Sequence, residues 1–180
     1  KSTLEKAMKF ESDCKMIFWK RKNIFQKNMF LLLLYLITTV SFAQSGSCNA
    51  TLIVENNGNT RSTPLDGTYY SLILTNNSSS TDTFVLSSKN INASCANTDG
   101  SSTAGNVIVN TGFIDSSRSS LSEITLSAGE SVNFYLHITV PAGTSTQKWS
   151  CNKITANSKN CSNYAVDTVL HTYIINPVND

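Results

Sequence analysis

The chain has 180 residues, of which 40% are hydrophobic and 14% are charged, and its formal net charge is +2 at pH 7. The charge is unevenly divided, because 8 of the 14 basic residues and 3 of the 12 acidic ones lie within residues 1–43. The remaining residues carry 6 basic and 9 acidic side chains, a net charge of about −3. This part lacks the basic surface expected of a nucleic-acid-binding domain, and we expect no DNA or RNA partner.

The first 43 residues have the pattern of a secretory signal peptide. A basic stretch over residues 20–27 precedes the apolar run MFLLLLYLITTV at 29–40, and small residues at Ser41 and Ala43 suit a cleavage site. The apolar run of 12 residues is shorter than the roughly 18 that cross a membrane. We expect translation to start at Met16, cleavage to follow Ala43, and the mature chain to contain no membrane span.

Residues 44–180 are enough for one domain and too few for two ordinary ones. They contain four cysteines, Cys48, Cys95, Cys151 and Cys161. An even number in an exported chain indicates two disulfides, and the wide spacing argues against a zinc site. If strands alternate in direction, the pairs Cys95–Cys151 and Cys48–Cys161 are favoured. The pairing of Cys48 with Cys95 and of Cys151 with Cys161 stays open as the alternative.

Three strands are predicted in the first half of the domain. Residues 50–55 (ATLIVE) alternate apolar and polar side chains and end at the Asn-rich turn 56–59. Residues 68–75 and 81–87 alternate in the same way, with a polar five-residue link between them. A short link between two alternating runs favours a hairpin, so we expect these two strands to pair.

Residues 89–118 predict a long loop with one or two short strands. Only 107–109 and 113–114 are apolar between turn-forming segments. The motif Asn97-x-Asp99-Gly100-Ser101 is similar to the start of a calcium-binding loop, but no bidentate acid follows at the required spacing. We therefore expect Asp99 to be a turn residue.

The clearest strand of the chain is residues 131–140, which follow a brief predicted strand at 124–126. Its apolar side chains recur at every second position, which is typical of a half-buried strand: Val132, Phe134, Leu136, Ile138 and Val140. Pro141 ends it, since proline has no N–H to donate within a sheet. We expect the other strands to be shorter and to pack on this one.

Two further strands are predicted after Pro141, at 147–156 and 166–175. Trp149 and Cys151 have one parity in the first of them, and Ile154 and Ala156 have the other. All four are residues that favour burial, so we expect a bulge near Asn152 and a place in the core for Trp149.

The predicted fold is all-β, a single immunoglobulin-like sandwich with Greek-key connections that follows the signal peptide. About seven short strands separated by turns, without any helical apolar stripe, favour this class over one with crossover helices. The strand patterns predict a core of large apolar side chains: Leu52, Val54, Leu72, Leu74, Phe84, Leu86, Phe134, Leu136, Ile138 and Trp149.

Three stretches resemble bacterial immunoglobulin-like modules of the NEW3 type. They are residues 69–86, where Asn76-Asn77 precedes the strand DTFVL, residues 124–130 (ITLSAGE), and residues 134–144, which end in HITVPAGT. In that family a polar pair precedes a D-x-F-x-L strand, and the strand after "pGe" ends in "tVPagt". The four cysteines and the long loop at residues 89–118 depart from the pattern. The resemblance, over roughly residues 50–175, implies a non-catalytic accessory module of exported proteins.

The sequence contains no recognisable catalytic motif. Its histidines are His137 and His171, both within predicted strands, and neither accompanies a nucleophile elbow or a metal-binding motif. We expect His137 to face solvent and His171 to pack at the edge of the core. The chain is therefore predicted to be no enzyme, with no catalytic residue, no metal and no cofactor.

Strand parity places several large side chains outward: Ile53, Tyr69, Ile73, Tyr135 and Tyr173. Exposed tyrosines can hold a sugar, whereas an exposed apolar patch more often marks a protein contact. We predict a binding surface that comprises Tyr69, Ile73, Tyr135 and His137. The predicted role is structural, adhesive or protein-binding, in a secreted or cell-surface module whose partner is a surface protein. Carbohydrate binding through the exposed tyrosines is the alternative.

Overall fold

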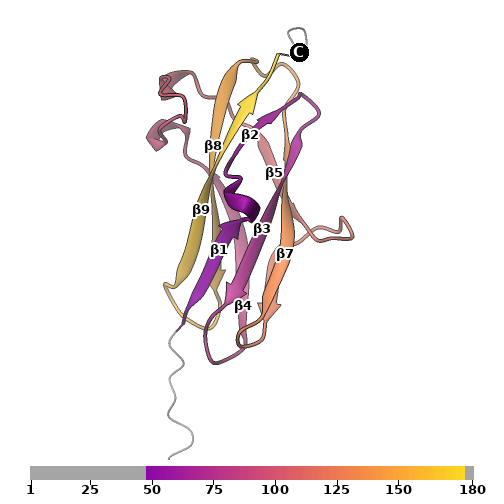
Figure 1. Ribbon diagram of the computed structural model, residues 1–180, viewed down its shortest axis with the longest axis vertical. Helices are drawn as coiled ribbons and strands as arrows, with labels where there is room; N and C mark the ends of the chain where they lie inside the picture. The colour runs from indigo at the N-terminus through magenta and orange to yellow at the C-terminus, as the bar shows by residue number, and fades with distance from the viewer. Residues whose placement is uncertain (1–47, 177–180) are drawn as a thin grey trace, which may run out of the picture. The chain divides into compact units, whose positions relative to one another are not determined.

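The computed structural model describes residues 48–176, so the predicted signal peptide lies outside the described residues. Within this range the chain forms nine strands in two facing sheets (Figure 1). The predicted all-β sandwich is confirmed, with more strands than the seven or so expected. No helix in this part of the chain is long and apolar enough to cross a membrane.

The first sheet has four strands in the order β1-β3-β7-β5, all paired antiparallel. They are β1 (Ala50–Val54), β3 (Thr68–Asn76), β7 (Ser131–Thr139) and β5 (Asn110–Ile114). The strand β7 is the one predicted most clearly, and it lies inside the sheet between β3 and β5. The strand β5 is one of the short strands expected within the long loop.

The second sheet has five strands in the order β2-β9-β8-β4-β6. They are β2 (Thr60–Thr63), β9 (Ala165–Ile174), β8 (Lys148–Ser158), β4 (Asp82–Asn90) and β6 (Glu123–Leu126). The strand β2 was not predicted, because its sequence TRST has no apolar alternation, and it pairs parallel with β9 at the edge of the sheet. With 11 and 10 residues, β8 and β9 exceed the 9 of β7, so the expectation that β7 is the longest strand is wrong.

The predicted hairpin between β3 and β4 is wrong, because these strands belong to opposite sheets. Their link crosses the sandwich and is held by the buried side chain of Asn76. Its Nδ2 donates to the carbonyl oxygens of Ser80 (2.8 Å) and Leu126 (3.1 Å), while its Oδ1 accepts from Ser78. A polar five-residue link suits both kinds of connection, so the composition could not distinguish them.

The hydrophobic core lies between the two sheets. Nine of the ten predicted core residues belong to one buried cluster, and Trp149 is the exception. The cluster also contains buried residues that the predicted core list did not include: Tyr70, Leu126, Ile154, Leu170 and Ile174. The sandwich is thus stabilised mainly by burial of apolar side chains from both sheets.

The predicted bulge near Asn152 is absent. β8 pairs with β9 in unbroken register along ten residues. The change of parity has another cause: β8 is buried on both faces over residues 149–152 and on its core face alone after that. Ile154 and Ala156 face the core, whereas Trp149 and Cys151 point away from it and are covered by the segment between β4 and β5.

The segment 91–109, which we call the insertion, covers one end of the outer side of the five-stranded sheet, at the start of β8 (Figure 1). The indole N–H of Trp149 donates to Oδ2 of Asp99 in the insertion (2.9 Å), and the Trp149 ring packs against Tyr173 at 5.0 Å between centroids. The expected burial of Trp149 is confirmed, but the residue lies outside the central core cluster. Trp149 is buried in a smaller cluster on the opposite face of the sheet.

Both disulfides have the favoured pairing, and the alternative pairing is wrong. Cys95–Cys151 ties the insertion to β8, with Cα atoms 6.3 Å apart. Cys48–Cys161 ties the residues before β1 to the link between β8 and β9, with Cα atoms 6.4 Å apart. Two disulfides in one small domain are typical of extracytoplasmic proteins.

Tyr70 brings a polar group into the core. Its hydroxyl donates to the backbone carbonyl of His171 and lies within hydrogen-bond distance of the Thr172 hydroxyl, both at 2.9 Å. The Arg61 guanidinium lies over the ring, 5.5 Å from its centroid. Burial raises the pKa of Tyr70 to about 12, and the hydrogen bond with Thr172 and the charge of Arg61 only partly offset this effect.

Alkaline pH should therefore destabilise the domain through Tyr70. As the pH rises from 10 toward 12, the unfolded chain releases the Tyr70 proton and the folded chain retains it. The free energy of unfolding should fall by up to about 3 kcal/mol over this range, at about 1.4 kcal/mol per tenfold change in proton affinity. Urea denaturation at several pH values would measure this slope, which Tyr70→Phe should flatten. Equal slopes in the two proteins would contradict the assignment.

Candidate functional site

The outward side of the four-stranded sheet, which we call the outer face, carries the predicted binding residues. Side chains on the odd-numbered positions of β3 and β7 point away from the core. They form three rows of cross-strand neighbours: Ile53, Ile73 and Asn133; Ser71, Tyr135 and Ile114; and Tyr69, His137 and Gly112. The structure thus places Tyr69, Ile73, Tyr135 and His137 on one surface.

An aromatic stack lies at one end of the outer face. The rings of Tyr69 and His137 are almost parallel, with an interplanar angle of 8° and centroids 4.3 Å apart. Tyr69 keeps 42% of its surface exposed. His137 was predicted to face solvent; it lies on the outer face as expected, but its side chain is half-buried there. One face of the Tyr69 ring is therefore occupied within the protein, and the rest of the side chain is available for a ligand.

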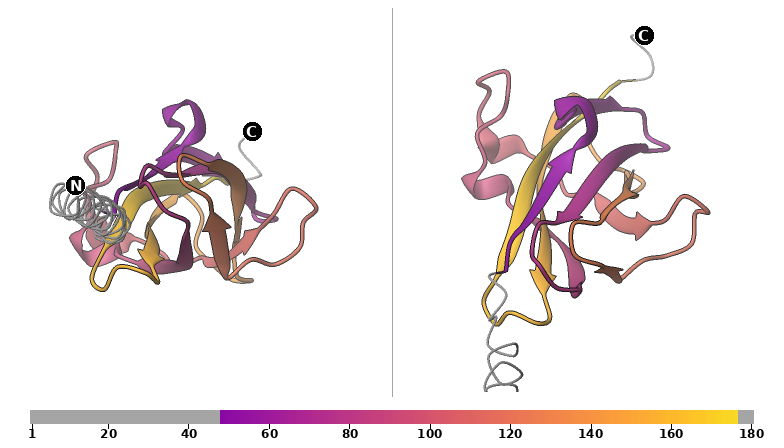
Figure 2. Two further views of the ribbon diagram at one scale, coloured as in Figure 1. Left: turned by 90° about the horizontal axis from the view of Figure 1, so that it is seen from below. Right: turned by 60° about the horizontal axis from the view of Figure 1, so that its bottom comes forward.

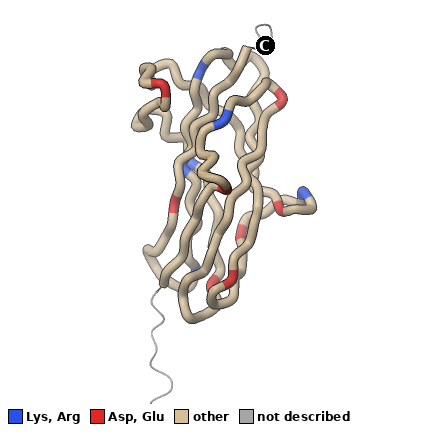
Figure 3. Tube along the Cα trace, viewed as in Figure 1, with Lys and Arg blue, Asp and Glu red and all other residues tan. Residues whose placement is uncertain are grey.

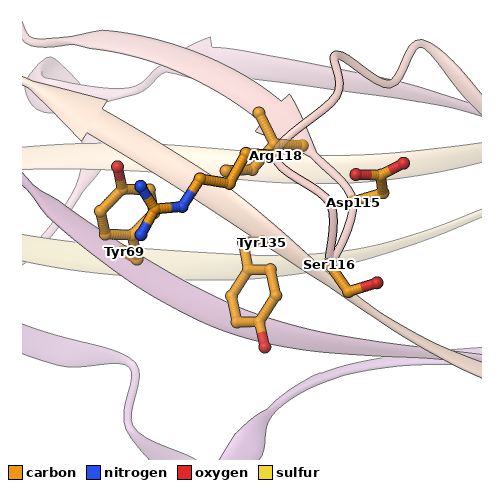
Figure 4. A pocket seen from close by; sticks show the side chains of 6 residues that line it. Tyr69, Asp115, Ser116, Arg118 and Tyr135 are labelled. Carbon is orange, nitrogen blue, oxygen red and sulfur yellow. The ribbon is translucent and has the colours of Figure 1, made fainter.

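A hollow of about 360 Å³ lies beside this stack, and we call it the tyrosine hollow. Its lining comes from the outer face and from the loop after β5: Tyr69, Ile114, Asp115, Ser116, Arg118 and Tyr135. In Figure 4 the Arg118 side chain extends from the loop toward the Tyr69 ring, and Tyr135 lies on the neighbouring strand. The hollow combines two aromatic rings with a basic and an acidic side chain.

The loop between β5 and β6 positions the charged side of the hollow. It projects away from both sheets in Figure 1 and in the two views of Figure 2. Oδ1 of Asp115 accepts hydrogen bonds from the backbone N–H groups of Ser117 and Ser119, each at 2.8 Å. Arg118 adopts a φ of 67°, which turns the chain at the tip of the loop. These contacts hold Arg118 at the rim of the hollow.

Charges are sparse in the described part of the chain and scattered over its surface (Figure 3). The two ion pairs found within residues 48–176 join Lys153 to Asp167 and Lys159 to Glu123. Arg118 takes part in neither of them. Its guanidinium group, with five N–H donors, can therefore meet an acidic or hydrogen-bonding group of a ligand.

Sequence reasoning missed Asp115, Ser116 and Arg118. They belong to the segment 89–118, which carried no pattern beyond a loop with short strands. Only the pairing of β5 with β7, which sets Ile114 opposite Tyr135, brings them to the outer face. A long-range strand pairing of this kind leaves no local signal in the sequence.

A second hollow, of about 260 Å³, lies between the insertion and the start of β8. Its polar side chains are bonded to each other, since the amides of Asn97 and Asn106 exchange two hydrogen bonds at 2.9 and 3.0 Å. Asp99 accepts from the Trp149 indole, a bond that lowers the pKa of its carboxyl group. It also accepts from the N–H of Ser101, so the prediction of a turn residue is confirmed. The hydrogen bonds around this hollow hold the insertion against β8.

No family model matches the chain, and no curated protein matches it. Among solved structures it is similar to a family 123 glycoside hydrolase from Clostridium perfringens (11% identity, TM-score 0.47), over 72% of this chain and 28% of the hydrolase. It is also similar to a FixG-related protein from Vibrio parahaemolyticus (10%, TM-score 0.43; 71% and 95% covered) and to the periplasmic chaperone SfaE (11%, TM-score 0.40; 72% and 58% covered). The chain thus spans about a quarter of the length of the hydrolase.

Proposed function

We propose that this chain is an exported, non-catalytic module of the NEW3 type that binds a partner protein at the cell surface through the outer face. The observation that carries the proposal is the presence of several large apolar and aromatic side chains on this one face of the sheet. Ile53 is 51% exposed and pairs with Ile73 on the neighbouring strand. Tyr69 and Tyr135 continue this surface toward the tyrosine hollow.

Single exposed apolar residues are ordinary on protein surfaces, and isoleucine suits any strand. The outer face differs because Ile53, Ile73, Tyr69 and Tyr135 lie on adjacent strands of one sheet. The core does not need them, since the inward residues of the same strands already form the buried cluster. A contiguous apolar surface of this kind often marks a site where another protein binds. Arg118, at its edge, is of a residue type enriched in interfaces.

The proposal predicts that Ile73→Asp weakens binding to the partner. A partner would first be captured from the surface fraction of the producing cell and identified, and its affinity for purified variants would then be measured. A charge at the centre of an interface should lower the affinity at least about tenfold. Val85→Asp is the matched control, because Val85 is an exposed strand residue on the other sheet. Equal affinities of the two variants would contradict the proposal.

The tyrosine hollow favours carbohydrate binding as the second candidate. Two aromatic side chains next to Asp115, Ser116 and Arg118 offer both ring surfaces and hydrogen-bonding groups, which a sugar requires. A glycan array with the wild-type protein and with Tyr135→Ala separates the two functions. Strong glycan binding that is lost in Tyr135→Ala and kept in Ile73→Asp would replace protein binding with sugar binding.

A further inference from the structure

A cluster of metal-binding residue types lies outside the outer face, under the insertion. Cys151 on β8 and His171 on β9 are direct cross-strand partners. The disulfide with Cys151 places Cys95 next to both of them. Nδ1 of His171 lies 3.4 Å from Sγ of Cys151 and 3.6 Å from Sγ of Cys95. All three potential ligand atoms lie within 4.8 Å of one another.

The distances from the imidazole to the sulfur atoms are those of a tetrahedral zinc centre. With Zn–S bonds of about 2.3 Å and a Zn–N bond of about 2.0–2.1 Å, tetrahedral angles separate the nitrogen from each sulfur by about 3.5 Å. We propose that reduction of Cys95–Cys151 creates a zinc site from the two cysteines and His171. Three protein ligands leave the fourth position to water or to an incoming ligand.

The two states of this cluster exclude each other. A dithiol reductant supplies two electrons and two protons, the S–S bond breaks, and the reductant becomes a disulfide. Zn²⁺ then displaces the protons of both thiols and bonds to the thiolates and to Nδ1. In the reverse step a disulfide acceptor takes two electrons from the thiolates and two protons from solvent and becomes a dithiol, while the ion is released and the S–S bond re-forms. The cluster is therefore a redox-dependent metal site.

Contacts independent of the disulfide hold the insertion in place. The N–H of Cys151 donates to Oδ1 of Asn92 (2.7 Å), and the N–H of Ile91 donates to the carbonyl of Cys151 (3.0 Å). The indole of Trp149 bonds to Asp99 further along the insertion. These bonds keep Cys95 above β8 after reduction, when the two sulfur atoms need to separate to only about 3.8 Å for tetrahedral binding.

The surroundings suit a metal ion as well. Cys95 and Cys151 are buried, which shields their sulfur atoms from solvent. The Nδ1 atom of His171 lies within reach of both sulfur atoms, and a neutral imidazole nitrogen is a common zinc ligand. The disulfide Cys48–Cys161 has no such histidine among the described metal-binding groups, and it provides an internal comparison.

Cobalt binding tests this site directly. The protein would be reduced with a phosphine, freed of reductant under argon and titrated with Co²⁺. We expect one ion per chain, with thiolate-to-cobalt charge-transfer absorption and the visible bands of tetrahedral Co²⁺, both removed by adding Zn²⁺. His171→Gln should weaken cobalt binding at least about tenfold, as expected for loss of one of three ligands. Cys48→Ser/Cys161→Ser should leave it unchanged.

Circular dichroism and thermal unfolding of the reduced protein complete the test. We expect a retained β-sheet spectrum and a melting temperature that rises with Zn²⁺, as for any ligand that binds the folded state. The proposal is wrong if charge-transfer absorption is absent, if His171→Gln binds cobalt as the wild type does, or if the reduced chain is unfolded with and without Zn²⁺.

Discussion

Leu136→Asp should abolish folding of the sandwich. Leu136 lies at the centre of β7, fully buried between the two sheets. The substitution removes a buried leucine, which contributes about 1.5–3 kcal/mol, and places in the same site a carboxylate whose unpaired burial costs several kcal/mol more. The sum approaches or exceeds the about 5–15 kcal/mol by which a domain is usually stable. We expect no cooperative thermal transition in circular dichroism.

Asn133→Asp is the matched control for this substitution. Asn133 lies on the same strand, three positions earlier, and its side chain is exposed on the outer face. It receives the same charged residue without burial, so the free energy of unfolding should change by no more than about 0.5 kcal/mol. A Leu136→Asp protein that melts cooperatively near the temperature of the control would show that β7 does not lie in the core.

Removal of either disulfide should destabilise the domain by about 2–4 kcal/mol, chiefly because the unfolded chain gains freedom. Cys48–Cys161 links residues 113 positions apart, and Cys95–Cys151 links residues 56 apart. A twofold longer loop adds about 0.6 kcal/mol in chain entropy, so loss of Cys48–Cys161 should have the larger effect.

Urea denaturation of the two double cysteine-to-serine variants would measure both effects under one condition. The slope of the free energy with urea also reports any residual structure in the unfolded chain. A variant that unfolds at the same urea concentration as the wild type would contradict the role assigned to its disulfide. A larger loss without Cys95–Cys151 would mean that the insertion contributes to stability beyond the loop it closes.

Alternation was a sufficient signal wherever a strand buries only one face. Phe134, Leu136 and Ile138 were placed in the core correctly because their neighbours in sequence face outward. The same parity placed Tyr69 and Tyr135 on the outside. The disulfide pairing followed from strand direction, which is a coarse property of a sandwich and survives errors in strand boundaries.

Prediction failed where long-range contacts decide the structure. β2 forms because it pairs with the last strand. Its own sequence gives no strand pattern, since Thr63 is the one buried residue of its four. Trp149 and Ile154 have opposite parity and are both buried, because the insertion covers the second face of β8. The sequence alone offered a bulge as the simplest explanation of this pattern, and it could not reveal that a distant segment supplies the cover.

The candidate site was predicted only in part, because some of its residues are brought together by long-range strand pairing. Parity on β3 and β7 identified four of its residues, including the partners Tyr69 and His137. Their face-to-face stacking depends on the register of the two strands, which one residue of slip would destroy. Arg118 depends on the pairing of β5 as well, and its contribution to the hollow became apparent only in the structure.

Site-directed photo-crosslinking tests the proposed interaction surface most directly. A photoreactive residue would replace Ile73 on the outer face in one protein and Val85 on the opposite sheet in another, and both would be irradiated on the surface of producing cells. We predict a discrete crosslinked protein from position 73, reduced by the second substitution Tyr69→Ala, and none from position 85. Crosslinking of the same protein from position 85 alone, or equally from both positions, would contradict binding through the outer face.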